Sequence, residues 1–204
     1  MEKNFSTKDN ILEAAIEEFL EKGFKEASIR DIAAKVGITS TALYRHFRDK
    51  EDIFIVIVQP VVDKLYKTIE SVTEFYFSKA EQGETYKLGE GEKEDIDIFV
   101  DLIYEDFDIW KLLLCKSEGT KYSDFMEQIV NLEQKTTSLY SDLLRKKGIK
   151  VNYIDDEELH LLLSAYYQAI SEIVYHDFDR EKTRHYIETL KKFLYPGWQN
   201  ILGF

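Results

Sequence analysis

Residues 28–50 read SIRDIAAKVGITSTALYRHFRDK, and this stretch decides the fold that we expect for the chain. Ser28 precedes a run of apolar residues at helical spacing and can cap a first short helix. Gly37 stands where a left-handed residue would end that helix, and Thr39 can cap a second one. The stretch therefore predicts two short helices joined by a tight turn, which is the helix-turn-helix arrangement.

The sequence around this stretch also has helical patterning. Apolar residues recur at steps of three and four over residues 7–22, and Gly23 is placed to end that helix. Asp49 can cap a fourth helix, which contains a β-branched run and Pro60. Because proline removes a backbone hydrogen bond, we expect a bend about one turn before Pro60.

The rest of the chain predicts a larger helical bundle. Residues 80–95 combine three glycines with many charges and predict an exposed, mobile loop. Helical patterning then covers residues 96–115 with a break near 106–108, followed by 122–147, 155–176 and 179–202, the last interrupted by Pro196 and Gly197. No stretch shows the alternation of a strand. We therefore expect an all-α fold of about nine helices, with a first domain over residues 1–50 and a second over 51–204.

The charge is divided unevenly between these two domains. The chain has a net charge of −12, but residues 1–50 hold 9 basic and 9 acidic residues, so the whole excess lies in residues 51–204. An acidic body repels phosphate and argues against a purely electrostatic mode of nucleic-acid binding. A neutral N-terminal domain stays compatible with DNA binding through a local patch.

Polar and positively charged side chains gather on the second helix of the helix-turn-helix and beside it. Hydroxyl, phenol, imidazole and ammonium groups can contact phosphate oxygens, whereas Ser40, Thr41 and Arg45 can reach base edges. Ser28 and Thr39 also fit a purely structural role as caps. Taken together, the set predicts a DNA-binding surface formed by Ser28, Arg30, Thr39, Ser40, Thr41, Tyr44, Arg45, His46 and Lys50.

The N-terminal quarter of the chain resembles the DNA-binding domain of TetR-type transcriptional regulators. The resemblance is carried by Ala14-Ala15, Phe19, Gly23-Phe24, Ser28 to Ala33, Val36 to Ile38, Leu43 to Phe47 and Lys50-Glu51. It implies that Tyr44, His46 and Lys50 contact phosphates. The chain departs from the family pattern at Ser40 and Thr41, where Lys and Gly are common, so the base sequence that it reads cannot be transferred from the family.

The resemblance further implies a dimer whose interface is built from the last two helices of each subunit. Residues 157–176 are apolar around nearly the whole helix, which predicts burial on two sides. The last helix also carries an apolar stripe. A core within one subunit explains both patterns as well. The residues assigned to the interface are Ile170, Ile173, Ile187, Leu190 and Leu194.

A ligand cavity in the C-terminal domain is the other feature that the resemblance implies. The domain is rich in aromatic rings and carboxylates, which would suit a lipophilic or cationic small molecule through cation–π contacts. Most aromatic residues at helical spacing belong to an ordinary core instead. The candidates for the cavity wall are Phe99, Tyr104, Phe107, Trp110, Phe125, Met126, Tyr140, Tyr166 and Tyr167.

Other kinds of site have weaker signals. His176, Asp179 and His185 are close in sequence, but a helix end and a cap explain the first two, so neither a metal nor another cofactor is expected. No nucleophile–base pattern indicates an enzyme. The single Cys115, expected to be buried, excludes an internal disulfide. A sequence without a signal peptide or a membrane span predicts a cytoplasmic protein.

Together these features predict a ligand-responsive transcriptional regulator, taken as a repressor. It would bind a near-palindromic operator as a homodimer and be released by a small-molecule effector. Two other classes stay open. A DNA-bound adaptor whose bundle recognises a protein partner predicts a filled bundle and an exposed apolar patch. A small-molecule-modifying enzyme on a helical scaffold predicts a polar cluster with a shifted pKa inside the bundle.

Overall fold

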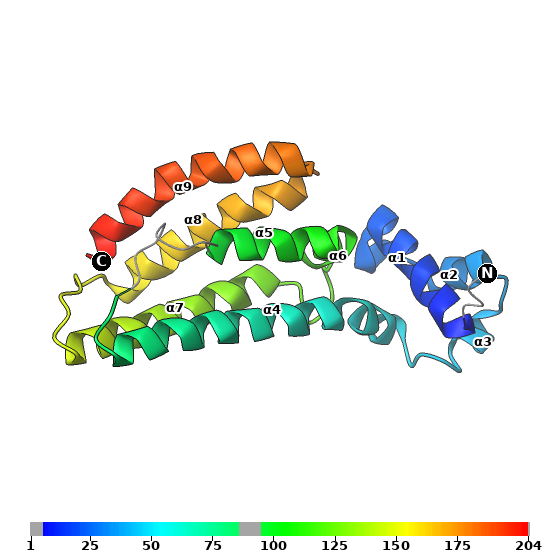
Figure 1. Cartoon of the computed structure of the whole chain (residues 1–204). Helices are drawn as coiled ribbons and strands as arrows, with labels where there is room; N and C mark the ends of the chain where they lie inside the picture. The colour runs from blue at the N-terminus through cyan, green and yellow to red at the C-terminus, as the bar shows by residue number, and fades with distance from the viewer. Residues whose placement is uncertain (1–5, 86–94, 204) are drawn as a thin grey trace. The chain divides into compact units, whose positions relative to one another are not determined.

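The computed structural model describes residues 6–85 and 95–203, and within these ranges the chain is helical without a strand (Figure 1). The prediction of an all-α fold with about nine helices is confirmed. The described helices are α1 (Thr7–Glu26), α2 (Ile29–Val36), α3 (Ser40–Leu43), α4 (Lys50–Glu81), α5 (Asp95–Glu105), α6 (Phe107–Cys115), α7 (Phe125–Lys146), α8 (Asp156–Tyr175) and α9 (Arg180–Leu202).

Side-chain caps set the starts of several helices at the positions that the sequence predicts. The Thr39 hydroxyl accepts a hydrogen bond from the backbone N–H of Ala42 at 3.1 Å at the start of α3. The Asp179 carboxylate accepts one from the backbone N–H of Lys182 at 2.8 Å at the start of α9. Asp49 has the same role before α4. Each cap satisfies a backbone donor that has no partner within its own helix.

Packing divides the chain into two compact units, which are described separately. The first contains the described residues of Met1–Lys64 together with Asp106–Phe125, and the second contains those of Leu65–Glu105 together with Met126–Phe204. The division therefore falls inside α4, and it adds α6 to the N-terminal helices. The predicted division of function between residues 50 and 51, after the first residue of α4, stays a prediction.

The first unit has a core of aromatic rings. The rings of Phe19, Phe24 and Phe54 pack against one another, with centroids 5.4 to 5.8 Å apart. The backbone N–H of Phe24 donates to the carbonyl oxygen of Lys116 at 2.9 Å, which ties α1 to the end of α6. Trp110 of α6 is also fully buried. These contacts give the short α2 and α3 a rigid base, because isolated helices of that length barely form.

Gly23 and Gly37 are among the glycines of this unit that take a backbone conformation which other residues rarely adopt. Gly23 has φ 76° and ψ 160° and interrupts α1 after Lys22, where the sequence predicts the helix to end, although α1 extends to Glu26. Gly37 has φ 74° and ends α2 as a left-handed cap. The sharp turn at Gly37 brings the chain directly to Thr39 and the start of α3.

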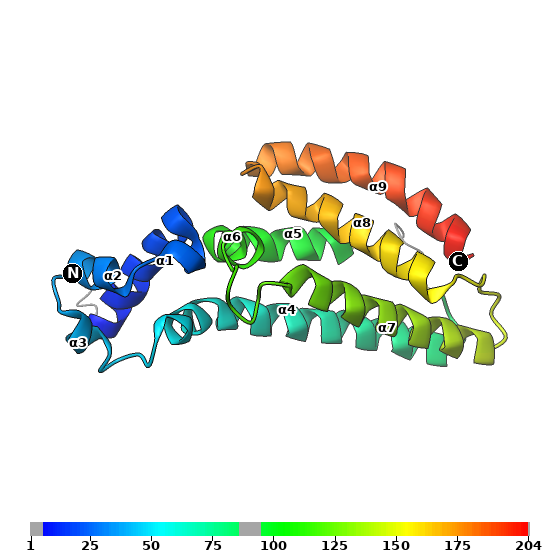
Figure 2. The same cartoon turned by 180° about the vertical axis from the view of Figure 1, so that it is seen from behind.

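The second unit is a helical bundle. Figures 1 and 2 show α8 alongside α9, and α7 alongside the later part of α4. Tyr140 of α7 packs against Tyr76 and Phe77 of α4, with ring centroids 6.0 and 5.6 Å apart. Ala80 and Leu144 complete this cluster. The apolar faces of α4 and α7 therefore meet over several turns.

The predicted position of one loop and one predicted helix break differ from the structure. The expected loop over residues 80–95 begins too early, because α4 continues to Glu81 and buries Ala80; residues 86–94 of that loop lie outside the described residues. The expected break at Pro196 is absent from α9, which runs from Arg180 to Leu202. Buried Tyr195, Trp198 and Leu202 hold the last turns of α9 in place, so tertiary packing outweighs the cost of the proline. The helix α4 also continues through Pro60, where the expected bend stays a prediction.

The expected burial of Cys115 is also wrong, since its side chain is exposed. Cys115 is the last residue of α6, and Leu112 and Leu113 already fill the buried side of that helix. Among the helices of the described ranges, none is both long and apolar enough to cross a membrane.

Candidate nucleic-acid interface and ligand cavity

The outer side of α3 and the residues just after it form a polar surface. Thr39, Thr41, Tyr44, Arg45 and His46 are exposed, and Ser40 is half-buried. We call these six residues the recognition surface. The opposite side of the same segment is anchored in the core by Leu43 and Phe47, which are 0% and 3% exposed. This anchoring fixes the direction of the polar side chains, so they are presented together despite the short length of α3.

The predicted residues on α2 lie at its first turn. The Ser28 hydroxyl accepts a hydrogen bond from the backbone N–H of Asp31 at 3.4 Å and so acts as the cap of α2. Arg30 is exposed. A capping hydroxyl can still accept or donate a second hydrogen bond, so the cap and the predicted DNA contact are compatible.

Lys50 is placed differently from the other predicted DNA contacts. Its ammonium donates to the carbonyl oxygens of Ala27 at 2.8 Å and Lys25 at 3.1 Å, and it lies 4.7 Å from the centroid of the Phe24 ring. Burial lowers the pKa of this ammonium below its ordinary value. Lys50 thus ties the first turn of α4 to the last turn of α1 and to Ala27, the residue that follows α1. An ammonium has three donors, so these two bonds leave one for a phosphate oxygen.

A buried carboxylate supports the helix-turn-helix from behind. The Glu18 side chain is 1% exposed and pairs with the ammonium groups of Lys22 at 2.7 Å and Lys35 at 3.5 Å. It also accepts a hydrogen bond from the backbone N–H of Ser28 at 3.4 Å. Burial alone would raise the pKa of Glu18, but the hydrogen bonds from Lys22 and Ser28 outweigh burial and leave it below its ordinary value. The network joins α1 to the start of α2.

Sequence reasoning missed both Glu18 and Arg48. The signal for Glu18 was its position in the apolar stripe of α1, directly before Phe19, where a carboxylate must be paired. Arg48 follows the recognition surface and is 82% exposed at its side chain. Its guanidinium pairs with the Asp52 carboxylate at 2.9 Å, and its backbone N–H donates to the same carboxylate at 3.0 Å. This hydrogen bonding lowers the pKa of Asp52.

The second unit contains a cavity of about 230 Å³ that is partly open to solvent. Five helices, α4, α5, α7, α8 and α9, contribute to its wall, which is mostly aliphatic and aromatic. The lining residues are Leu65, Thr68, Ile69, Val72, Thr73, Tyr76, Phe77, Ile96, Ile98, Phe99, Glu133, Thr136, Thr137, Tyr140, Leu163, Tyr166, Tyr167, Ile170, Tyr195, Trp198 and Leu202.

Comparison with known proteins identifies the family. A family model described as bacterial regulatory proteins of the tetR family matches residues 11–57, which cover most of α1, all of α2 and α3 and the start of α4. The chain thus carries a TetR-family DNA-binding domain over these residues. The resemblance seen in the sequence is thereby confirmed.

Individual TetR-family relatives match parts of the chain. The transcriptional repressor KstR2 of Mycolicibacterium smegmatis is 31% identical over 77 residues, which are 38% of this chain and 38% of KstR2. The repressor BepR of Brucella suis is 44% identical over 52 residues, which are 26% of this chain and 25% of BepR. The matched parts therefore span well under half the length of these curated relatives.

A solved structure extends the likeness of fold over nearly the whole chain. A protein from Syntrophomonas wolfei that is assigned to the TetR family has a TM-score of 0.59 and 20% sequence identity, with 94% of each chain covered. At this identity the likeness concerns the fold alone. It includes the helical bundle that follows the TetR-family DNA-binding domain.

Four of the residues predicted for the cavity wall do line the cavity, namely Phe99, Tyr140, Tyr166 and Tyr167. The other five lie elsewhere. The Tyr104 hydroxyl donates to the carbonyl oxygen of Phe178 at 2.6 Å, which fixes α5 to the turn before α9. The described contacts of Met126 include Ser171, and Phe107, Trp110 and Phe125 belong to the first unit. None of the α4 residues that line the cavity was predicted for it.

The residues predicted for a TetR-family dimer interface face mostly inward. Ile170, Ile173, Ile187 and Leu190 are between 0% and 8% exposed within a single chain, and Leu194 is half-buried. Periodicity identified the buried faces of α8 and α9 correctly, but these faces pack against their own bundle. The exposed large apolar side chains on the same two helices include Leu161, at 62%, and Phe193, at 77%.

Proposed function

We propose that the protein is a DNA-binding transcriptional repressor that acts as a homodimer on a near-palindromic operator. The observation that carries this proposal is the recognition surface, whose hydroxyl, phenol, guanidinium and imidazole groups are exposed together while Leu43 and Phe47 fix the segment from behind. The curated relatives KstR2 and BepR, each of which matches part of the chain, are repressors.

The recognition surface divides into two kinds of contact. Ser40, Thr41 and Arg45 are assigned to base edges, since arginine pairs bidentately with guanine and a threonine methyl packs on thymine. Tyr44 and His46 are assigned to phosphate oxygens, which fix the register of the protein on the duplex. In a dimer, two such surfaces would enter successive major grooves about 34–36 Å apart.

A small molecule in the cavity is assigned the role of effector. The cavity lies in the second unit and combines an apolar wall with a few polar groups, which is the usual composition of a ligand site. A ligand that binds one conformation of the bundle more tightly than another shifts the population between them. The alternative of a protein-binding adaptor predicts a filled bundle, so the cavity favours a small-molecule effector.

Selection of duplexes from a random pool tests this function. We expect the purified full-length protein to enrich an inverted repeat whose half-site centres lie about one helical turn apart, at 10–10.5 base pairs, or a multiple of this spacing. Bound duplexes would be sequenced after several rounds at fixed salt, because salt sets the level of nonspecific binding. A final pool with the same base composition as the starting pool would refute sequence-specific binding.

Dimerisation is predicted to depend on the exposed apolar side chains of α8 and α9. We expect Phe193→Asp to weaken the dimer at least thirtyfold, on the order of a central interface residue, because it places a charge in an apolar contact. Sedimentation velocity over a concentration series measures the change. Leu139→Asp is the matched control, since Leu139 is 53% exposed on α7 and should leave the dimer intact. An unchanged dimer in Phe193→Asp would place the interface elsewhere.

A further inference from the structure

Among the described residues of the cavity wall, the ionisable groups of acids and bases give negative charge only. Among the described residues that line the cavity, Glu133 is the only carboxylate, and none is a lysine, an arginine or a histidine. The remaining polar groups are hydroxyls of threonine and tyrosine. An anion that entered this cavity would lose its hydration without gaining a cationic partner from these residues, and it would also meet the Glu133 carboxylate.

Aromatic rings make up much of the same wall. Tyr76 and Tyr140 meet with ring centroids 6.0 Å apart. A second group joins Tyr167, Tyr166 and Trp198, with centroids 5.3 Å apart between the two tyrosines and 6.3 Å apart between Tyr166 and Trp198. The faces of such rings carry partial negative charge and attract ammonium groups, most strongly where water is displaced. The rings therefore favour the same sign of ligand charge as Glu133.

The wall is also long in one direction. Its α4 residues run from Leu65 to Phe77, which corresponds to roughly 18 Å of helix. On α7, Glu133 and Tyr140 are two turns apart and share one face with Thr136 and Thr137. A carboxylate at one level and aromatic rings two turns further along suit an elongated ligand that has a charged end and an apolar body.

We propose that this cavity selects a lipophilic cation, an amine or quaternary ammonium compound with an extended apolar chain, over a carboxylate of the same size. Glu133 and the tyrosine rings are the selecting groups. The proposal deepens the proposed function and rests on it in one respect, namely that the cavity is the effector site. Charge selection by the cavity is measured without DNA, so the charge selection and the proposed effector role can be refuted separately.

Calorimetric titration of the full-length protein with three probes that share a ten-carbon chain tests the selection. The probes are decyltrimethylammonium, decanol and decanoate, which carry one positive charge, no charge and one negative charge at pH 7. We expect decyltrimethylammonium to bind at least tenfold more tightly than decanoate, with decanol between them. Decanoate binding as tightly as the cation, or no binding by the cation, overturns the proposal.

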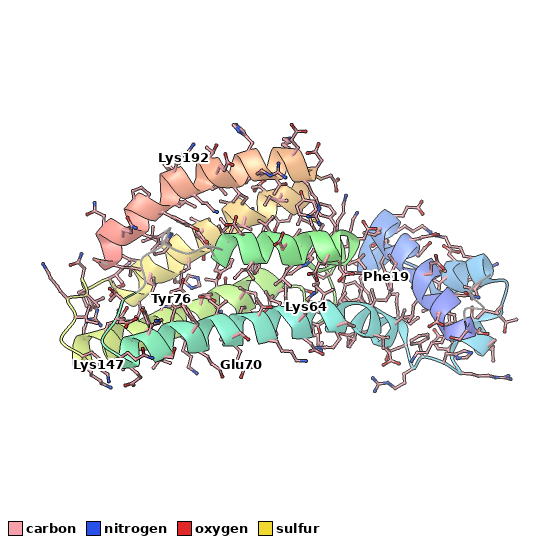
Figure 3. The ribbon with its side chains drawn as sticks, in the orientation of Figure 1. Phe19, Lys64, Glu70, Tyr76, Lys147 and Lys192 are labelled. Atoms are coloured by element: carbon pink, nitrogen blue, oxygen red, sulfur yellow. The ribbon has the colours of Figure 1, made fainter. Side chains whose placement is uncertain are left out.

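A pair of charge-neutralising variants locates the selecting group. Glu133→Gln should weaken decyltrimethylammonium binding about fivefold to tenfold and leave decanol binding unchanged, because only the charged probe loses a partner. Glu70→Gln is the matched control: Glu70 is exposed on α4 and lies on the side of that helix away from Tyr76 (Figure 3). Equal affinities of the cation for the wild type and Glu133→Gln would refute the role of Glu133.

Release of DNA is then measured on its own, by the anisotropy of a labelled selected duplex. Decyltrimethylammonium that binds the protein and lowers its affinity for the duplex supports both the selection and the effector role. Binding without any change in DNA affinity leaves the charge selection intact and refutes the effector role of the cavity. Decanoate as the tighter ligand and the stronger releaser refutes the selection and keeps the effector role.

Discussion

Arg45→Ala should lower the affinity for the selected duplex by about 5- to 150-fold and should lower the affinity for a scrambled duplex much less. Arg45 is exposed on the recognition surface, and a bidentate arginine–guanine contact contributes about 1–3 kcal/mol of discrimination. The two affinities would be measured by fluorescence anisotropy at one salt concentration. Arg184→Ala is the control, because Arg184 is an exposed arginine on α9, outside the recognition surface.

Lys50→Met gives the comparison that separates base contacts from phosphate contacts. This change keeps an unbranched side chain over the Phe24 ring but removes the ammonium that bonds to the Ala27 carbonyl. We expect it to weaken both duplexes equally and to reduce the salt slope by about 1, as the loss of one phosphate contact would. If Arg45→Ala also weakens both duplexes equally, the assignment of Arg45 to base edges is wrong.

Glu18→Gln should cost about 2–4 kcal/mol of unfolding free energy at pH 7. The glutamine removes a buried negative charge on which Lys22 and Lys35 converge, and breaking such a network leaves the remaining groups poorly paired. Denaturant unfolding followed by circular dichroism measures the change. Glu17→Gln is the control: Glu17 also approaches Lys35, at 3.6 Å, but its side chain is 67% exposed, so a change within about 0.5 kcal/mol is expected. Equal costs for the two variants would contradict the supporting role of Glu18.

The contribution of Glu18 to the free energy of unfolding should depend on pH in a defined direction. The pKa of Glu18 in the folded protein lies below its ordinary value of 4.5. A carboxylate whose pKa falls on folding stabilises the folded state fully above the unfolded pKa, and this contribution is lost as the pH falls through the folded pKa. The stability difference between the wild type and Glu18→Gln should therefore be constant near neutral pH and shrink below about pH 4.5. A difference that grows on acidification would contradict the paired state of Glu18.

Local signals in the sequence were sufficient for the helix-turn-helix. The caps at Ser28 and Thr39 depend on hydrogen bonds between residues only three positions apart, and the turn depends on Gly37 alone. Lys50 was harder to place, because its carbonyl partner at Ala27 lies 23 residues away. At Pro196 the local signal was misleading. The proline predicts a break, but burial of the neighbouring side chains keeps α9 continuous.

Periodicity predicts that a helix face is buried but does not predict what buries it. Ile170 and Ile187 were assigned to a partner subunit although their own bundle covers them. The cavity shows the same ambiguity: the stripe from Leu65 to Phe77 on α4 has the spacing of an ordinary core and yet lines a cavity. The distinction depends on the sizes of side chains that five helices bring together, which no single segment encodes.

The two tryptophans give each compact unit an optical reporter of its own. Trp110 is buried in the first unit and Trp198 lines the cavity of the second, and the chain contains no other tryptophan. With Trp198→Phe, emission would follow only the unit that carries Glu18, and with Trp110→Phe it would follow only the ligand site. Unfolding of the first unit and ligand binding in the second can thus be followed in separate fluorescence spectra, without attaching a label to the protein.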